Sequence, residues 1–144
     1  MALVPLLGDK VEGKQGPVDV ASLSDNDVVG IYFSAHWCPP CRAFTPVLSE
    51  RYQTLRKDGT KFEVVFVSSD RDEESCAGYY AEMPWLILPF SDRQKKEQLA
   101  QKYGVRGIPT LVLVNPKTGE TITQDGRKII NDDVNGEKFP WNSC

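Results

Sequence analysis

Two cysteines, Cys38 and Cys41, are separated only by the prolines Pro39 and Pro40. An apolar run at residues 28–33 precedes the pair and apolar residues at helical spacing follow it, so we expect the pair where a strand meets a helix. Cysteines three residues apart in the first turn of a helix lie within the Cα separation of about 4.4 to 6.8 Å that a disulfide tolerates. The spacing therefore predicts a dithiol that closes and reopens with little backbone movement.

The start of a helix gives the two thiols different roles. Unpaired backbone amides and the positive end of the helix dipole favour a thiolate, and Cys38 is the cysteine nearest to them. We therefore expect Cys38 to be the nucleophile, and Cys41, one turn further on, to resolve the mixed disulfide. Arg42 adds positive charge nearby, while Pro39 and Pro40 remove two backbone donors that could otherwise face the sulfurs.

Two other interpretations of such a pair are half of a zinc site and a structural disulfide. A closed zinc site needs four ligands, commonly from two such pairs, and the remaining candidates His36, Cys76 and Cys144 do not lie at ligand spacing. The pattern therefore favours redox chemistry, with no metal and no bound cofactor beyond the Cys38-Cys41 disulfide. Cys76 is predicted to be a plain thiol on a helix, and Cys144, the last residue, a thiol open to adventitious intermolecular disulfides.

Length and composition indicate an ordinary globular protein. The chain has 144 residues, of which 40% are hydrophobic and 26% charged, so we expect one domain over residues 1–144 with an N-terminal extension at about residues 1–24, and a monomer. The formal net charge of −3 gives no global reason to bind nucleic acid. No apolar run near the N-terminus suits a signal or a membrane span. Cysteine usage fits a reducing compartment, the cytoplasm and perhaps the nucleus as well.

Strand and helix patterns alternate along the chain. Turn residues predict a hairpin at residues 10–20, and apolar runs predict strands or extended segments at residues 28–33, 62–67, 84–90 and 111–114. Helices are predicted from the cysteines to Gly59, from Asp70 with Glu73 as a capping pair, from Ser91 or Asp92 to Gly104, and at residues 128–131. This order, with a hairpin after residue 110, predicts an α/β fold with a central mixed sheet, helices on both faces and an N-terminal hairpin.

The segment Trp37-Cys38-Pro39-Pro40-Cys41-Arg42, together with Ile108-Pro109-Thr110 before a later strand, resembles the thioredoxin superfamily. Further motifs in the same order resemble the tryparedoxin and nucleoredoxin group, over residues of about 28 to 141. They are Tyr32-Phe33-Ser34-Ala35, Glu63-Val64-Val65-Phe66-Val67-Ser68, Met83-Pro84-Trp85-Leu86, Leu88-Pro89-Phe90 and Phe139-Pro140-Trp141. The local motifs around residues 34–37 and 67–71 are more similar to nucleoredoxin, whereas the length is more similar to tryparedoxin.

This resemblance implies a thioredoxin-like three-layer fold and supplies roles for the residues around the cysteines. It implies that Pro109 is a cis proline facing Cys38 and Cys41, although a trans proline at a strand start is the plainer interpretation. It also implies that the backbone of Ile108 pairs with an extended substrate segment. Trp37 is expected to contact partners, since exposed tryptophan often anchors interfaces, and Pro39, Pro40 and Arg42 share the substrate surface.

The sequence departs from ordinary thioredoxin at one position. Six residues before the first cysteine, where a buried carboxylate is expected, stands Tyr32, and a phenol is a poor base at neutral pH. The proton of Cys41 would then pass to water, to the Cys38 sulfur, or to an acid such as Asp70 or Glu73. Acids at a helix start are more often caps. His36 could favour the thiolate when protonated or be a solvated spectator.

Three functions remain open. The first is a thiol-disulfide oxidoreductase that reduces disulfides in partner proteins, such as peroxiredoxins or signalling partners, and is re-reduced by an external thiol or an NADPH-dependent reductase. The second is a signalling module whose binding to partners depends on its redox state. The third is a peroxide-consuming enzyme, for which the sequence lacks a separate peroxidatic-cysteine motif. The cysteine pair favours the first.

Overall fold

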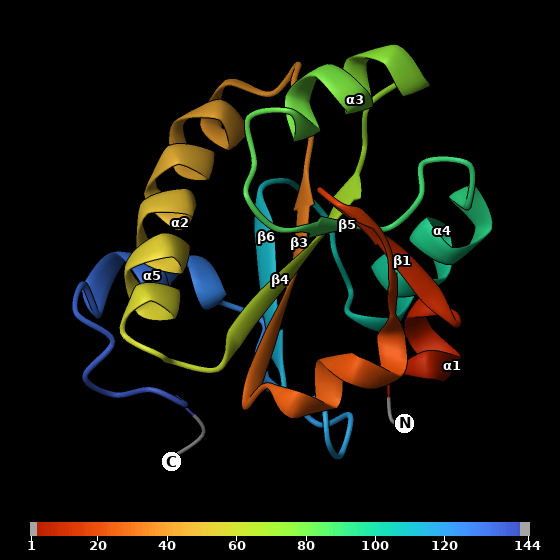
Figure 1. The fold of residues 1–144 in the computed structure, drawn as a ribbon. Coiled ribbons are helices and arrows are strands. Elements are labelled where there is room, and N and C mark those ends of the chain that lie inside the picture. The colour runs from red at the N-terminus through yellow and green to blue at the C-terminus, as the bar shows by residue number, and fades with distance from the viewer. Residues whose placement is uncertain (1–2, 142–144) are drawn as a thin grey trace.

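The computed structural model describes residues 3–141, which form a seven-stranded sheet with helices packed on it (Figure 1). The strands are β1 (Lys10–Gly13), β2 (Gly16–Asp19), β3 (Val28–Ser34), β4 (Phe62–Ser68), β5 (Leu86–Ile87), β6 (Thr110–Val114) and β7 (Thr121–Thr123). The helices are α1 (Val4–Leu7), the 3-10 helix η1 (Val20–Asp25), α2 (Pro39–Lys57), α3 (Glu73–Tyr80), α4 (Arg93–Lys102) and α5 (Gly126–Asp132).

The sheet is mixed, as the alternation of elements predicts. Its strand order is β2-β1-β5-β4-β3-β6-β7. The central strands β3, β4 and β5 run parallel to one another, whereas β6 and β7 form an antiparallel hairpin beside β3. The predicted N-terminal hairpin exists as β1 and β2, and β1 pairs with β5 through Glu12 and Ile87. The hairpin therefore extends the main sheet.

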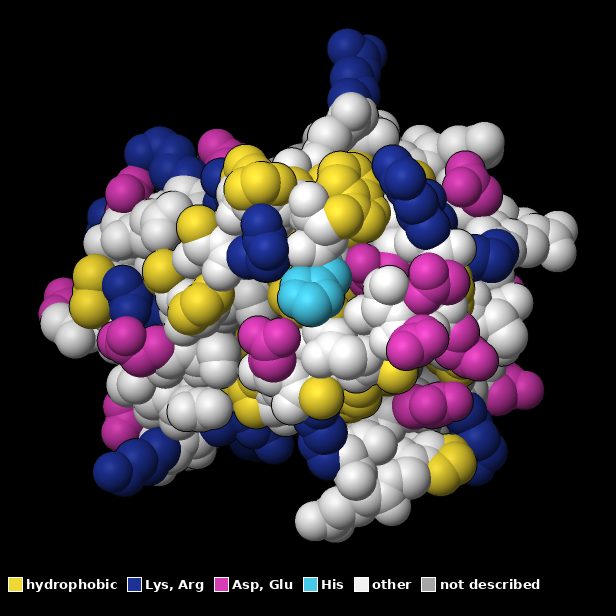
Figure 2. Space-filling view, turned by 90° about the horizontal axis from the view of Figure 1, so that it is seen from above, with side chains coloured by type: hydrophobic (Ala, Val, Ile, Leu, Met, Phe, Trp, Pro, Cys, Tyr) yellow, Lys and Arg dark blue, Asp and Glu magenta, His cyan; other side chains and the backbone are white. Residues whose placement is uncertain are grey.

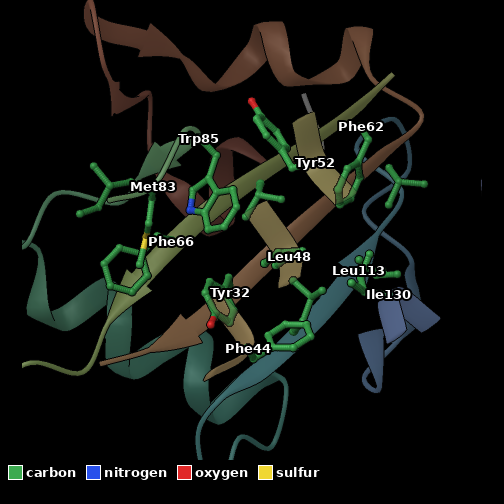
Figure 3. Packing of buried hydrophobic residues seen from close by; sticks show 14 of the residues in the cluster. Tyr32, Phe44, Leu48, Tyr52, Phe62, Phe66, Met83, Trp85, Leu113 and Ile130 are labelled. Atoms are coloured by element: carbon green, nitrogen blue, oxygen red, sulfur yellow. The ribbon is translucent and has the colours of Figure 1, made fainter. Parts of the chain in front are cut away.

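Two hydrophobic cores cover opposite faces of the sheet. We call them the α2-side core, beneath α2, α3 and α5, and the α4-side core, beneath α1, η1 and α4. Alternate residues of β3 point to different cores: Val28 and Tyr32 enter the α2-side core, while Val29, Ile31 and Phe33 enter the α4-side core. Figure 3 shows aromatic and aliphatic side chains of the α2-side core meeting over the central strands. The predicted arrangement with helices on both faces is confirmed.

The helix that follows the cysteines has the predicted boundaries. Its N-cap is Cys38, in an extended conformation, and Pro39 occupies the first helical position, where a missing N–H costs no intrahelical bond. The helix ends at Lys57, and Gly59 adopts a positive φ of 84° just beyond it. The first turn of α2 therefore begins directly at the reactive pair.

One predicted helix start is wrong. The N-cap of α3 is Asp72, whose side chain accepts a hydrogen bond from the Ser75 amide at 2.7 Å, so the helix begins at Glu73 rather than at Asp70. Asp70 lies buried in the loop after β4. For α4 the prediction is confirmed, since Asp92 is the N-cap and accepts a hydrogen bond from the Lys95 amide at 3.2 Å.

Candidate active site

The cysteine pair lies where the sequence predicts it, between the end of β3 and the first turn of α2. Both are free thiols; Cys38 is 5% exposed and Cys41 is fully buried. The two cysteines pack with Ala35 and with the partly buried side chain of Ile108. The sulfur nearer the surface is therefore that of Cys38, the one expected to meet a substrate.

The segment before β6 faces this sulfur. The Ile108–Pro109 peptide bond is cis, as the resemblance implies, and the Cys38 Sγ donates a hydrogen bond to the Ile108 carbonyl oxygen at 3.7 Å. The Arg127 guanidinium, from α5, donates to the Pro109 carbonyl at 3.2 Å and lies over the Phe44 ring. Sequence reasoning did not single out Arg127, because nothing local links α5 to this proline.

Cys41 sits in an environment that keeps it protonated. Burial, followed by a hydrogen bond with Cys38, raises the pKa of the Cys41 thiol to about 11, while hydrogen bonds from Ser34 and the Ala35 backbone act in the opposite direction. At neutral pH this thiol therefore carries its proton. Its attack on a mixed disulfide requires that the proton leave.

A group of buried hydroxyls lies beside Cys41. The Tyr32 and Thr45 hydroxyls are 2.7 Å apart, and Thr45 Oγ1 donates to the Cys41 carbonyl at 2.9 Å. The Tyr79 hydroxyl lies 2.5 Å from Thr45 Oγ1 and 2.8 Å from Ser34 Oγ. Burial raises the pKa of Tyr32. The phenol that replaces the expected carboxylate therefore stays neutral and is a poor base.

The three residues considered for proton transfer are placed around the pair without a bond to it. Asp70, 5% exposed, accepts the His36 amide on one carboxylate oxygen at 2.8 Å and the Ser68 hydroxyl on the other at 2.7 Å. The His36 ring stacks on Tyr79 with ring centroids 5.1 Å apart. Glu73 is exposed in the first turn of α3. Within residues 3–141, no hydrogen bond joins His36, Asp70 or Glu73 to Cys38 or Cys41.

The surface around the pair is polar, with one large exposed aromatic side chain. Trp37 is 53% exposed, and its indole N–H donates to the Ser69 carbonyl at 3.1 Å. It shares a pocket of about 510 Å³ with basic and acidic neighbours: His36, Arg42, Asp70, Arg71, Asp72 and Ser75. Figure 2 views this end of the molecule, with the chain's single histidine near the middle of the face and hydrophobic, basic and acidic side chains around it. Pro39 and Pro40 are exposed at the same junction.

Other predictions concern metals, membranes and the remaining thiols. Over residues 3–141, no group of three or more His, Cys, Asp or Glu side chains is arranged to hold a metal ion. No helix in the same range is long and apolar enough to cross a membrane. Cys76 is a buried free thiol on α3 whose pKa burial raises, as expected of a plain thiol. Cys144 lies outside the described residues.

Comparison with known proteins agrees with this geometry. A family model described as thioredoxin-like matches residues 26–121. Tryparedoxin from Trypanosoma brucei brucei is 44% identical over 128 residues, which cover 89% of this chain and 88% of that protein. A solved structure of tryparedoxin from Trypanosoma brucei superposes with a TM-score of 0.92 at 41% identity, covering 99% of both chains.

Nucleoredoxins are similar over a shorter share of their own length. Nucleoredoxin from Xenopus laevis is 49% identical over 121 residues, which are 84% of this chain and 29% of that protein. The chain thus spans less than a third of the length of this relative. The cysteine pair at a strand-to-helix junction, the cis proline opposite it and these similarities lead to one conclusion: the chain belongs to the thioredoxin-like family, in the group of tryparedoxins and nucleoredoxins.

Proposed function

We propose that this chain is a thiol-disulfide oxidoreductase that reduces disulfides in partner proteins. One observation carries the proposal: the Cys38 sulfur faces the Ile108 carbonyl beside the cis Pro109, with the Cys41 thiol buried behind it. A partner's sulfur can reach only the outer cysteine, and the inner one is held in reserve. This is the order of events that a two-step exchange needs.

In the first step the Cys38 thiolate attacks one sulfur of the partner's disulfide, and the other sulfur leaves as a thiolate. In the second step the Cys41 sulfur attacks Cys38, the Cys38–Cys41 bond forms and the second partner thiolate departs. The dithiol thereby gives two electrons to the partner. We propose no metal and no other cofactor, since the sulfurs carry the electrons.

The partner is held by main chain and by the surface around Trp37. An extended segment can pair with the backbone at Ile108, a mode of binding that reads main chain more than side chain. Selectivity then depends on the exposed Trp37 and on the charges of Arg42 and Arg71 beside it. Pro39 and Pro40, exposed at the helix start, complete the contact surface.

The oxidised protein must be reduced again by a thiol. A solved tryparedoxin II, 38% identical and with a TM-score of 0.91, is described as complexed with glutathionylspermidine. By similarity we propose a low-molecular-weight thiol of the glutathione class or an NADPH-dependent reductase as reductant, and disulfide-containing partners such as peroxiredoxins. We also propose that the chain acts as one monomeric domain in the cytoplasm, with the nucleus as a second location.

Steady-state reduction of insulin disulfides tests the main proposal. Cys38→Ser should abolish the activity, because the attacking sulfur is lost, whereas the matched variant Cys76→Ala should retain it, because Cys76 is a buried thiol on α3 outside the site. Full activity in Cys38→Ser would eliminate the proposal. Re-reduction of the oxidised protein with glutathione, with trypanothione, or with thioredoxin reductase and NADPH would then identify the class of reductant.

A redox-dependent interaction module is the second candidate. The exposed Trp37 directly before the pair supports it, because closing the disulfide changes the surface that this indole adjoins. Partner capture by the reduced protein, the oxidised protein and a variant lacking both cysteines would test it. Equal binding by all three forms would remove redox control of binding, and disulfide reduction would remain.

A further inference from the structure

The fate of the Cys41 proton is the open chemical question of the proposed function, and the inference that follows depends on that function. Two obvious acceptors are already engaged. The Tyr32 hydroxyl bonds to Thr45 and lies 3.5 Å from the Cys41 carbonyl, and both carboxylate oxygens of Asp70 accept hydrogen bonds from other groups. A third route must therefore carry the proton away from the sulfur.

Buried hydroxyls from two different elements supply that route. Ser34, the last residue of β3, hydrogen-bonds to the Cys41 thiol, and its Oγ lies 2.8 Å from the Tyr79 hydroxyl of α3. Both side chains are almost completely buried. In each of the two contacts at Tyr79, with Ser34 and with Thr45, either oxygen can be the donor. The chain of hydroxyls can therefore reverse its direction of donation.

The far end of this chain meets a surface pocket. Tyr79 and Thr45 line a pocket of about 390 Å³ together with the exposed residues Arg42, Glu50 and Glu82. The pocket is large enough for several waters, since one water occupies about 30 Å³ in the liquid. On its other face the Tyr79 ring is covered by the stacked His36 ring, so the phenol is held in place. Tyr79 thus connects the interior beside Cys41 to water.

We propose that Ser34 and Tyr79 form a proton relay that carries the Cys41 proton to water in this pocket. As Cys41 attacks, its proton passes to Ser34 Oγ, the Ser34 proton passes to the Tyr79 oxygen, and the Tyr79 proton passes to a pocket water. The Cys38–Cys41 bond forms, the bond from Cys38 to the partner breaks, and the partner leaves as a thiolate with the bonding electron pair. Each hydroxyl ends with one proton, so the relay is restored when the groups turn back.

Two properties of Tyr79 suit it to pass a proton on rather than to keep one. Burial raises its pKa, although hydrogen bonds from Ser34 and Thr45 oppose the shift, so the phenol stays protonated at neutral pH. The titratable groups that face Cys41 are Cys38, Tyr32 and Tyr79. His36 and Glu82, 3.9 Å apart, lie on the outer side of the Tyr79 ring.

A rapid-mixing experiment separates the two chemical steps. The reduced protein is mixed with a symmetrical aromatic disulfide whose thiolate product is coloured, so that the first thiolate reports attack by Cys38 and the second reports attack by Cys41. Tyr79→Phe keeps the ring and removes the hydroxyl. The first release should be unchanged, and the second should slow by about tenfold, below the 10² to 10⁴ typical of direct proton transfer because water in part replaces the phenol.

The pH dependence distinguishes a relay from a merely structural role. In Tyr79→Phe the rate of the second release should rise more steeply with pH than in the wild type, because hydroxide from solvent must now remove the proton. The matched control is Tyr103→Phe, in the α4-side core, whose buried hydroxyl has no hydrogen-bond partner within residues 3–141. This control should leave both releases at wild-type rates.

A second variant covers the case in which Tyr79→Phe does not fold. Ser34→Ala breaks the relay at the sulfur and should also slow the second release, and the double variant should be no slower than the slower single one. Wild-type rates and pH profiles of the second release in the folded variants would overturn the relay. Absence of the first release in the wild type would instead overturn the proposed function, so the two failures are distinguishable.

Discussion

The two cores share the strands of one sheet but differ in chemistry. The α4-side core is built almost wholly from aliphatic side chains and Phe33, and its one tyrosine, Tyr103, has an unbonded hydroxyl among the described residues. The α2-side core contains the hydroxyls of Tyr32 and Tyr79, which are hydrogen-bonded to Ser34 and Thr45. A step of one residue along β3 therefore separates a face that only packs from a face that supports the cysteines.

This contrast teaches that the reactive pair depends on one face of the sheet for its chemistry and on the other for its rigidity. Burial without hydrogen bonds gives stability that is indifferent to the state of the sulfurs. Buried polar groups give less net stability, yet they fix positions and respond to charge. Substitutions on the two faces should accordingly change different observables.

The largest expected effect is a loss of packing in the α4-side core. Leu99, on α4, is buried there, and Leu99→Ala should lower the free energy of unfolding by about 2 to 5 kcal/mol. Denaturant unfolding measures the loss, and the rate of the first thiol-disulfide step in the folded protein should be unchanged. A change in that rate would show that the two faces are not independent.

The next effect is a loss of stability of the reduced protein at alkaline pH. The pKa of Cys41 is raised from 9.0 to about 11 by burial, so the folded state holds its proton to higher pH than the unfolded state. The resulting stabilisation is complete below about pH 9 and is lost as pH rises toward 11. The stability of the wild type relative to Cys41→Ala should therefore fall over this window, by up to about 2 to 3 kcal/mol.

Denaturant unfolding of both proteins under reducing conditions, at intervals from pH 8.5 to pH 11, measures this difference. Subtracting the variant removes the common contribution of lysines and tyrosines. A difference that stays constant with pH would contradict the raised pKa. The oxidised wild type, which has no thiol at position 41, should show no such contribution.

A smaller effect is expected from Tyr32→Phe in the α2-side core. The hydroxyl bonded to Thr45 is lost, and a typical hydrogen bond of this kind contributes about 1 kcal/mol. Thermal or denaturant unfolding measures the change. Because Tyr32 does not lie between Cys41 and the pocket, the second release in rapid mixing should slow less than in Tyr79→Phe. Equal slowing in both variants would place Tyr32 on the proton path.

The smallest effect is expected from Tyr103→Phe. Its buried hydroxyl has no partner among residues 3–141, so removing it should change the free energy of unfolding by less than about 1 kcal/mol, in the stabilising direction. Comparison with Tyr32→Phe then measures what hydrogen bonding adds to the same substitution. A destabilisation as large as that of Tyr32→Phe would show that both phenols are equally well bonded.

Much of the fold could be predicted because its signals are local. Apolar runs predict β3, β4 and β6, and turn residues predict the hairpin of β1 and β2. The wrong start of α3 has a simple cause: Asp70, Asp72 and Glu73 lie within four positions, and sequence alone does not say which acid caps the helix. The short α1 was not predicted, since its four residues carry no helical pattern and it is held by tertiary contacts with α4 and η1.

The site was predicted only in part for a similar reason. Cys38 and Cys41 are adjacent in the chain, and Pro109 follows from the resemblance. The hydroxyl contacts join residues far apart in sequence, Ser34 to Tyr79 across 45 positions and Thr45 to Tyr79 across 34. The sequence indicates that Tyr79 faces a core, but not which hydroxyls it meets there. Arg127 escaped notice because its partner, the Pro109 carbonyl, is a backbone atom.

The outer strands of the sheet bear on how copies of the chain behave when crowded together. β2 at one end contains Pro17, which lacks an amide donor, and β7 at the other end is only three residues long. Exposed strand edges recruit further strands and seed aggregates unless they are short or interrupted. Neither edge offers an unbroken row of donors and acceptors, so the protein should resist edge-to-edge aggregation at high concentration.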